Sequence, residues 1–164
     1  MHLQKLSSND GEQIYRMLQD IGSCENSFSN PVHGMSCEEY KNWLVQQEDW
    51  SEGRNLPEGY VAQTIYWLMN DENIPVGIGK IRHALTEHSR KIGGNVGYAV
   101  SSEYRGHGYG TVILRLLLEE ARKMKLEEIM LTVDKYNNAS KRVIEANGGI
   151  LFDENSERWY FRIP

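Results

Sequence analysis

The stretch YRGHGYGT, residues 104–111, constrains the fold of this chain more than any other segment. It places glycines at the alternate positions Gly106, Gly108 and Gly110, directly after the apolar run Val96–Val100. Apolar side chains then recur at helical spacing, at Val112, Ile113, Leu116, Leu117 and Ala121. A strand, a glycine loop and a helix in this order let main-chain amides at the helix start approach an anion closely. The segment therefore predicts a phosphate-binding loop.

The spacing of this loop excludes two common phosphate motifs. A Walker A loop needs a lysine before Ser or Thr after its last glycine, but Gly110 is followed by Thr111 and Val112. The dinucleotide fingerprint GxGxxG fails because its third glycine falls on Thr111 or on Ile113. Arg105 offers a permanent positive charge to a phosphate oxygen, and His107 or Thr111 could add a donor. Hydrolysis of a nucleoside triphosphate and binding of a dinucleotide are both disfavoured.

The remaining periodicity predicts an α/β chain with a mixed sheet, folded as a single domain over residues 1–164. Ser8–Asp10 is expected to cap the first helix, Ser36 with Glu39 the second, and Asn137 the last. Residues 23–35 and 83–94 are expected to be loops. Helices are predicted from the Ser8–Asp10 cap through the apolar face of residues 14–21, from Ser36 to about Trp50, at about 112–125 and at 137–147. Strands are predicted at 2–6, 60–69, 74–81, 96–100, 128–133, 150–152 and 158–163.

Charge and composition limit the classes of partner. The net charge is −5 and the Lys and Arg residues are scattered, which argues against nucleic acid and suits a cationic substrate. No apolar stretch approaches the ~20 residues of a membrane helix, and we expect no membrane partner. Cys24 and Cys37 are too few for a disulfide framework, which favours a reducing, cytoplasmic location. The histidines show no metal-site spacing, and we expect no metal.

Two segments together carry a family resemblance. The first is R-x-x-G-x-G, Arg105 to Gly110; the second is the strand Ile129–Val133 followed by Asn137-Asn138-Ala139-Ser140 and a helix that closes on Gly148-Gly149. In this order they resemble the GCN5-related N-acetyltransferase (GNAT) family over roughly residues 93–151. The run IRHALTEHSRKIGGNVGY resembles one subgroup of predicted acetyltransferases. The resemblance implies a mixed, mostly antiparallel sheet with helices on both faces.

The resemblance also implies a co-substrate, acetyl-CoA, and residues that hold it. The main chain of Tyr98, Ala99 and Val100 would bind the pantetheine arm as an added strand. Asn137 and Ser140 would contact the arm from the last helix. The pyrophosphate would lie on the loop formed by Arg105, Gly106, His107, Gly108, Tyr109, Gly110 and Thr111.

The catalytic groups are less well marked in the sequence. Many family members place an acidic tyrosine seven residues after the asparagine, and here that position is Ile144. Tyr136 is therefore the candidate acid; the alternatives are that Ser140 donates only a hydrogen bond or that the thiolate leaves unaided. Gly94 and Asn95 stand where some members have a carboxylate, so His83 is the candidate base, with Glu103 and Asp134 as alternatives acting through water.

These features predict an acetyl-CoA-dependent N-acetyltransferase that acts by direct attack of a primary amine, on a small molecule or a peptide. It would act as a monomer or a homodimer. The alternative is a module on the same fold that binds an acyl-CoA, or a protein partner, without turnover. The missing tyrosine at Ile144 keeps this alternative open.

Overall fold

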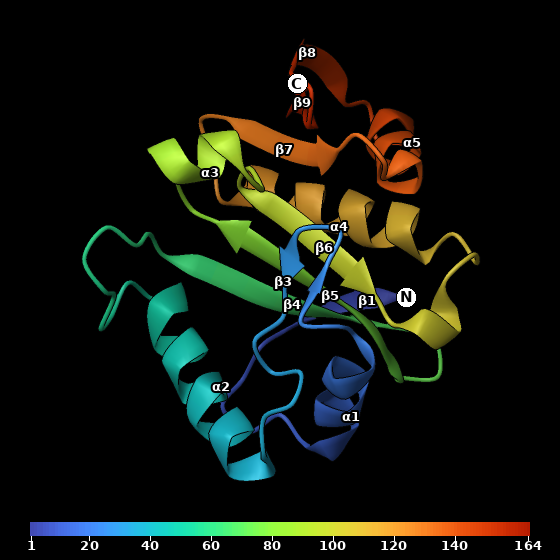
Figure 1. The fold of residues 1–164 in the computed structure, drawn as a ribbon. Helices are drawn as coiled ribbons and strands as arrows, with labels where there is room; N and C mark the ends of the chain where they lie inside the picture. Colours follow the sequence, from blue (N-terminus) through green and yellow to red (C-terminus); the bar gives the residue numbers. More distant parts are fainter.

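The structure is a computed structural model that describes residues 1–164, and its two larger sheets share one junction (Figure 1). The larger sheet is antiparallel, in the order β1-β4-β5-β6. Its strands are β1 (His2–Lys5), β4 (Gln63–Met69), β5 (Pro75–Arg82) and β6 (Val96–Val100). The smaller sheet has the order β7-β9-β8, with β7 (Ile129–Asp134), β8 (Ile150–Glu154) and β9 (Arg158–Ile163). The predicted α/β class and the mostly antiparallel sheet are confirmed.

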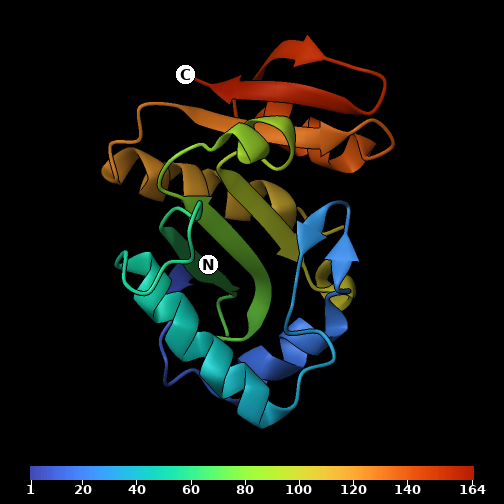
Figure 2. The same cartoon turned by 60° about the vertical axis from the view of Figure 1, so that its left-hand side comes forward.

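Helices cover both faces of the larger sheet, as Figures 1 and 2 show. The helices α1 (Glu12–Asp20) and α2 (Cys37–Ser51) pack on one face, against Ile65, Trp67 and Ile78. On the other face α4 (Tyr109–Lys123) buries Ile113, Leu117 and related side chains together with β7 and β9. The last helix, α5 (Asn138–Ala146), packs beside α4. Burial on both faces explains why β4 and β5 are apolar runs without strict alternation.

The two sheets meet at the beginning of β6 and then diverge. The amide of Asn95 donates to the carbonyl of Met130 at 2.9 Å, and its side chain accepts from the Met130 amide at 2.8 Å. Gly94 has φ +64°, and a Cβ there would come within 2.0 Å of the Met130 carbonyl oxygen, so only glycine fits. Beyond this junction β6 and β7 separate, and an open strand edge is left between them.

Three local predictions need correction. Residues 83–94 contain the helix α3 (Glu87–Lys91), which Thr86 caps. Residues 23–35 contain a hairpin of β2 (Cys24–Glu25) and β3 (Phe28–Ser29), which short polar segments such as these do not reveal by periodicity. The cap of α1 is Gly11 and not Ser8–Asp10, because Asp10 instead accepts from the Trp67 indole at 2.7 Å.

Other local predictions are confirmed. Ser36 and Glu39 form a reciprocal capping box at the start of α2. Asn137 caps α5 by accepting from the Ser140 amide at 3.1 Å. Both cysteines are free thiols, and both are exposed. None of the helices combines the length and the apolar character that a membrane span requires.

Candidate active site

One cavity of about 460 Å³ collects most of the residues that the sequence singled out. It lies between the diverging strands β6 and β7, the start of α4, the start of α5 and the β2–β3 hairpin (Figure 2). Its volume falls in the range of small-molecule sites. The following predicted residues line it: Tyr98, Ala99, Val100, Arg105, Gly106, Gly108, Tyr109, Gly110, Thr111, Asn137 and Ser140. Of the predicted binding residues only His107 is not in the lining; it lies beside Tyr109 in the loop.

The ladder between β5 and β6 decides which main-chain groups face the cavity. The Ser101 amide donates to the Val76 carbonyl, and the Asn95 carbonyl accepts from the Arg82 amide. Ser101–Val76 and Asn95–Arg82 are therefore hydrogen-bonded pairs of the ladder. Because such pairs alternate along an antiparallel ladder, Ala99 directs its amide and carbonyl toward β5. The amides of Tyr98 and Val100 point the other way, toward the open edge. Ala99 can therefore contribute only its side chain, which corrects the expectation for its main chain.

The glycine loop presents a group of unpartnered amides. Gly106 has φ +78° and Gly108, the residue before α4, has φ +80°, both in the left-handed region that favours glycine. The amides of residues 106–110 donate to no protein acceptor, and no acidic side chain occupies the first turn of α4. Such a helix start concentrates positive potential where an anion can bind.

Arg105 points toward the hairpin that covers the cavity. Its guanidinium pairs with Glu25, and its Nε donates to the Val100 carbonyl at 3.0 Å. To reach a phosphate on the loop, Arg105 must exchange Glu25 for the new anion. Asp20 fixes the base of the loop by accepting from the Ser102 amide at 2.7 Å. Burial alone would raise the pKa of Asp20, but hydrogen bonds from Ser101 and Ser102 outweigh it and lower the pKa.

A hydroxyl pair crosses the cavity from β6 to α5. The Tyr98 hydroxyl and the Ser140 hydroxyl lie 3.0 Å apart. Burial raises the pKa of Tyr98 to about 12, so its phenol stays protonated at neutral pH. No sequence pattern favours the Tyr98 side chain over others, because the pairing of β6 with β5 decides whether the Tyr98 ring points to α5.

Tyr136 lies outside the cavity lining and is 71% exposed. Its hydroxyl donates to Asp134 at 3.0 Å, and this hydrogen bond raises the pKa of the phenol. Asp134 also accepts from Ser27 at 2.6 Å and lies 2.6 Å from Arg158. The aspartate is only 6% exposed, and the three partners take most of its roughly four acceptor sites. The geometry favours neither Tyr136 nor Asp134 as a group that exchanges protons with a substrate.

The other candidate bases also lie away from this cavity. His83 follows β5, lines a separate cavity with Asn95 and Glu128, and shares a 2.8 Å hydrogen bond with Thr64. Burial lowers its pKa. Glu103 lines a third cavity beside α1. The structure therefore does not bring His83 together with the predicted co-substrate residues.

Several lining residues escaped the sequence reasoning. They are Asn26, Ser27 and Phe28 from the hairpin, Gly93 and Thr132 at the fork, and Val143 on α5. Gly93 and Thr132 are tied by a 2.6 Å hydrogen bond from the Gly93 amide to the Thr132 hydroxyl. In the sequence, only the adjacent glycines 93 and 94 hinted that this segment belongs to the site. Nothing in the sequence marked the hairpin as a wall of the site.

Comparison with known proteins places this geometry in a family. The family model described as an acetyltransferase (GNAT) domain matches residues 1–150. Among curated proteins, no sequence matches this chain.

Solved structures support the same fold at low sequence identity. The ribosomal-protein-S5-alanine acetyltransferase from Vibrio fischeri has a TM-score of 0.73 at 18% identity, covering 98% of this chain and 90% of its own. The N-acetyltransferase PseH from Campylobacter jejuni, in complex with acetyl coenzyme A, has a TM-score of 0.64 at 12% identity, covering 98% and 96%. A spermidine N-acetyltransferase SpeG mutant from Vibrio cholerae has a TM-score of 0.66 at 14% identity, covering 99% and 94%. The match over residues 1–150 shows that this chain belongs to the GNAT family of acetyltransferases.

Proposed function

We propose that this acetyltransferase moves the acetyl group of acetyl-CoA to a primary amine by direct attack. The observation that carries this proposal is the continuity of one cavity, from the free amides of residues 106–110 to the open edge of β6. A pyrophosphate and an extended arm need these two surfaces in this order. The two free thiols fit a reducing compartment, and a cytoplasmic location is part of the proposal.

The residues present fit such a co-substrate. The loop amides and, after release from Glu25, the Arg105 guanidinium would hold the pyrophosphate. The Tyr98 main chain and the Val100 amide would extend the sheet toward the arm, whereas the Val100 carbonyl already accepts from Arg105. Asn137 accepts from the Ser140 amide through its oxygen, which leaves its side-chain NH₂ free for an amide of the arm. When bound, acetyl-CoA supplies an activated acetyl thioester.

The direction of the arm places its reactive end near the fork. Because the loop follows Val100, an arm that starts at the loop runs back along β6 toward Asn95. The Tyr98 amide then lies closer to the reacting carbonyl than the Val100 amide does, and it can donate to the oxygen on which charge gathers.

The Tyr98 hydroxyl, and not that of Tyr136, would assist the departing thiolate. A phenol with a pKa of about 12 does not transfer its proton readily to a thiolate of pKa about 8.5. It can instead donate a hydrogen bond that stabilises the departing sulfur, with Ser140 holding the ring in place. Glu25, held by Arg105 and the Gly22 amide, is the only carboxylate in the cavity lining, and no imidazole lines it, so we expect the amine to lose its proton to water in the cavity.

A thiol-release assay tests the proposal. The purified protein is mixed with acetyl-CoA and a panel of amino acids, peptides, polyamines and aminoglycosides. We expect amine-dependent release of free CoA thiol. Tight CoA binding by calorimetry, with no turnover on any amine, would instead favour the binding module without turnover.

Tyr98→Phe tests the hydroxyl pair. We expect kcat to fall by about 10-fold, because the leaving sulfur loses one donor, while KM for acetyl-CoA changes little. Tyr136→Phe is the matched control, since it removes the same atom from an exposed side chain outside the cavity. Steady-state kinetics decide the matter: a larger loss in the Tyr136 variant would return the role to Tyr136.

Glu25→Gln tests the pairing of Arg105. The glutamine keeps an oxygen for the Gly22 amide but removes a negative charge from the cavity wall. We expect CoA to bind about 3- to 10-fold more tightly, because Arg105 no longer has to leave a carboxylate. Glu103→Gln serves as control, as Glu103 lines a different cavity. Calorimetry with CoA gives the answer, and unchanged or weaker affinity in the Glu25 variant would contradict it.

A further inference from the structure

One end of the larger sheet carries polar side chains on the face that α1 and α2 cover elsewhere. Ile65 and Ile78 are buried beneath these helices. Two residues further along the same face stand Gln63 on β4 and Lys80 on β5, with Arg82 at the end of β5. A sheet face that turns polar where the helices stop is suited to contact something other than the protein's own core.

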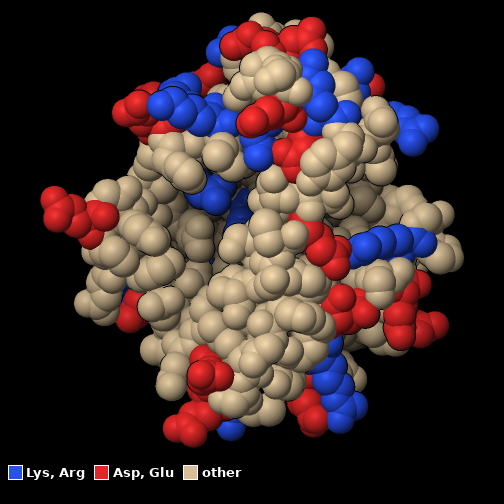
Figure 3. All heavy atoms as spheres, viewed as in Figure 1, with Lys and Arg blue, Asp and Glu red and all other residues tan.

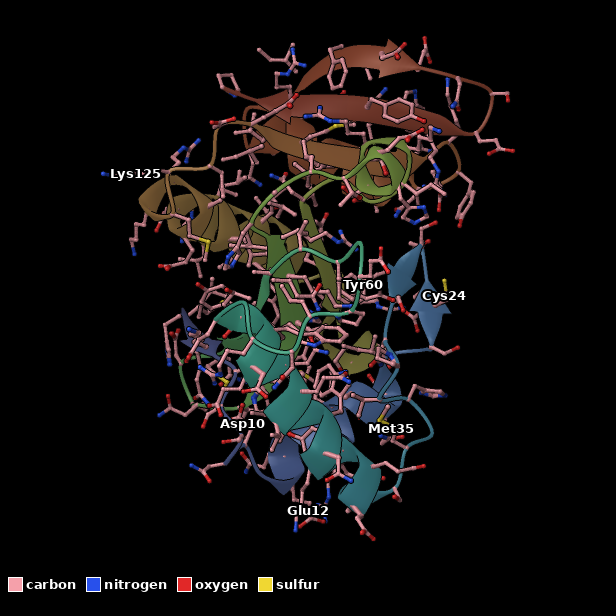
Figure 4. All side chains as sticks on the ribbon, turned by 90° about the vertical axis from the view of Figure 1, so that its left-hand side faces the viewer. Asp10, Glu12, Cys24, Met35, Tyr60 and Lys125 are labelled. Atoms are coloured by element: carbon pink, nitrogen blue, oxygen red, sulfur yellow. The ribbon has the colours of Figure 1, made fainter.

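Figure 3 shows a hollow at this place, beside the β2–β3 hairpin, with Lys or Arg atoms at its bottom. Lys80 and Arg82 are the only Lys or Arg residues on β4, β5 and β6. Figure 4 shows Tyr60 on the segment that follows α2. Tyr60 is 59% exposed and packs edge-on against Trp50.

Both cations lie directly behind the lining of the cavity already described. The Lys80 ammonium lies 4.6 Å from the centre of the Phe28 ring, and Phe28 lines the cavity. A Cβ on Gly93, another lining residue, would come within 3.4 Å of Arg82 Nη1. The hollow and the fork of β6 and β7 are therefore neighbours, and a ligand anchored at Lys80 and Arg82 can extend to the fork.

These cations have no carboxylate partner. Seven of the 18 Lys and Arg residues form no ion pair. Five of the seven are exposed, namely Lys5, Lys41, Arg122, Lys125 and Arg142, and the other two are Lys80 and Arg82. Burial, with Arg82 nearby, lowers the pKa of Lys80 to about 8. Two adjacent, half-buried positive charges without a counterion are costly to keep unless an anion joins them.

The donors that remain free define the anion. Arg82 Nη1 donates to the Gly94 carbonyl at 2.9 Å, but Nε and Nη2 have no protein acceptor. This edge of a guanidinium matches the two oxygens of a carboxylate. Lys80 donates to the Ser29 carbonyl and keeps further N–H groups free.

From this geometry we infer that the acceptor is a free amino acid or a similar small amine that also carries a carboxylate, held by Arg82 and Lys80 with its amine at the fork. The inference rests on the proposed function and narrows its acceptor. It also reverses the expectation from net charge, because the sheet end that borders the site is positive although the chain as a whole is acidic. The same cations disfavour an ammonium beside them, which helps the acceptor amine to become neutral without a side-chain base.

Matched pairs of acceptors test this inference in the thiol-release assay. Alanine is compared with alaninamide, and lysine with cadaverine, so that only the carboxylate changes. We expect kcat/KM to be at least about 10-fold higher for the member with the carboxylate. Arg82→Gln and Lys80→Gln should each reduce this ratio at least 5-fold, whereas Arg122→Gln, an exposed and unpaired cation on α4, should leave it unchanged. An equal or higher value for alaninamide or cadaverine overturns the inference.

A binding arm separates this inference from the proposed function. Calorimetry measures N-acetylalanine against N-acetylalaninamide on the wild-type protein, which needs no turnover and no folded variant. Tighter binding of the carboxylate supports the anion site even if no amine is acetylated, a result that would remove only the proposed function. Equal binding of the two compounds overturns the anion site, whether or not the protein is active.

Discussion

Replacing Gly108 by aspartate should weaken CoA binding by at least about 100-fold while the protein still folds. Gly108 directs its missing side chain into open space, since a Cβ there would meet no atom within 4 Å. An aspartate would place a carboxylate beside the amides that we assign to the pyrophosphate. At about 5 Å and an effective dielectric constant of about 20, one like charge costs roughly 3 kcal/mol. Calorimetry with CoA measures the loss, and a thermal melt by circular dichroism checks the fold.

Gly108→Asn is the matched control for this experiment. Asparagine has the same shape as aspartate and tolerates the same left-handed backbone, at φ +80°, but carries no charge. We expect the asparagine variant to keep CoA affinity within about 10-fold of the wild type. Equal losses in the two variants would show that the backbone or the bulk of the side chain matters there, and would remove the assignment of this loop to the phosphates.

The loop could be predicted from the sequence because its constraints are local. Gly106 and Gly108 have positive φ, and the helix that follows has an apolar stripe, so spacing alone identified both the turn and the helix start. The start of α5 could also be predicted from the sequence, because Asn137 caps this helix by accepting from Ser140, only three residues away. In both places the residues that matter are neighbours in the chain.

The hairpin wall of the cavity and the proposed acceptor side could not be predicted from the sequence, because their contacts join distant residues. Lys80 donates to the Ser29 carbonyl, 51 residues away in the sequence, and Arg105 pairs with Glu25, 80 residues away. The β2–β3 hairpin that supplies Ser29 and Glu25 is two residues per strand, too short for a periodic pattern. Which direction the Tyr98 main chain faces depends on its ladder with β5, and that register appears only in the folded sheet.

Asp134 and Arg158 illustrate a further limit, because a charge in a sequence does not show whether it is buried. The Arg158 side chain is 14% exposed and the Asp134 side chain 7%, so their pairing is shielded from solvent. Ser27 donates to the same carboxylate, which ties the hairpin over the cavity to the end of β7. Asp134 is a candidate base by its sequence position, but the structure favours a role in holding the cavity wall.

Asp134→Ala should therefore destabilise the whole protein and not merely slow the reaction. Removing one partner of a buried ion pair leaves the other charge without compensation, which typically costs about 3–5 kcal/mol. For a chain of 164 residues this lowers Tm by about 10 °C, as a thermal melt would show. Glu154→Ala, which breaks the exposed pair with Lys135, is the control and should leave Tm nearly unchanged.

Asp134→Asn separates the structural role from a catalytic one. Asparagine keeps an oxygen for the Ser27 and Tyr136 hydroxyls but loses the charge that Arg158 needs. We expect a loss of Tm with thiol release largely retained at low temperature, because Asp134 lies outside the cavity lining and its carboxylate is held by three partners. A variant with the wild-type Tm and no turnover would show the opposite, that Asp134 takes the proton from the amine and that Arg158 and Ser27 only orient it.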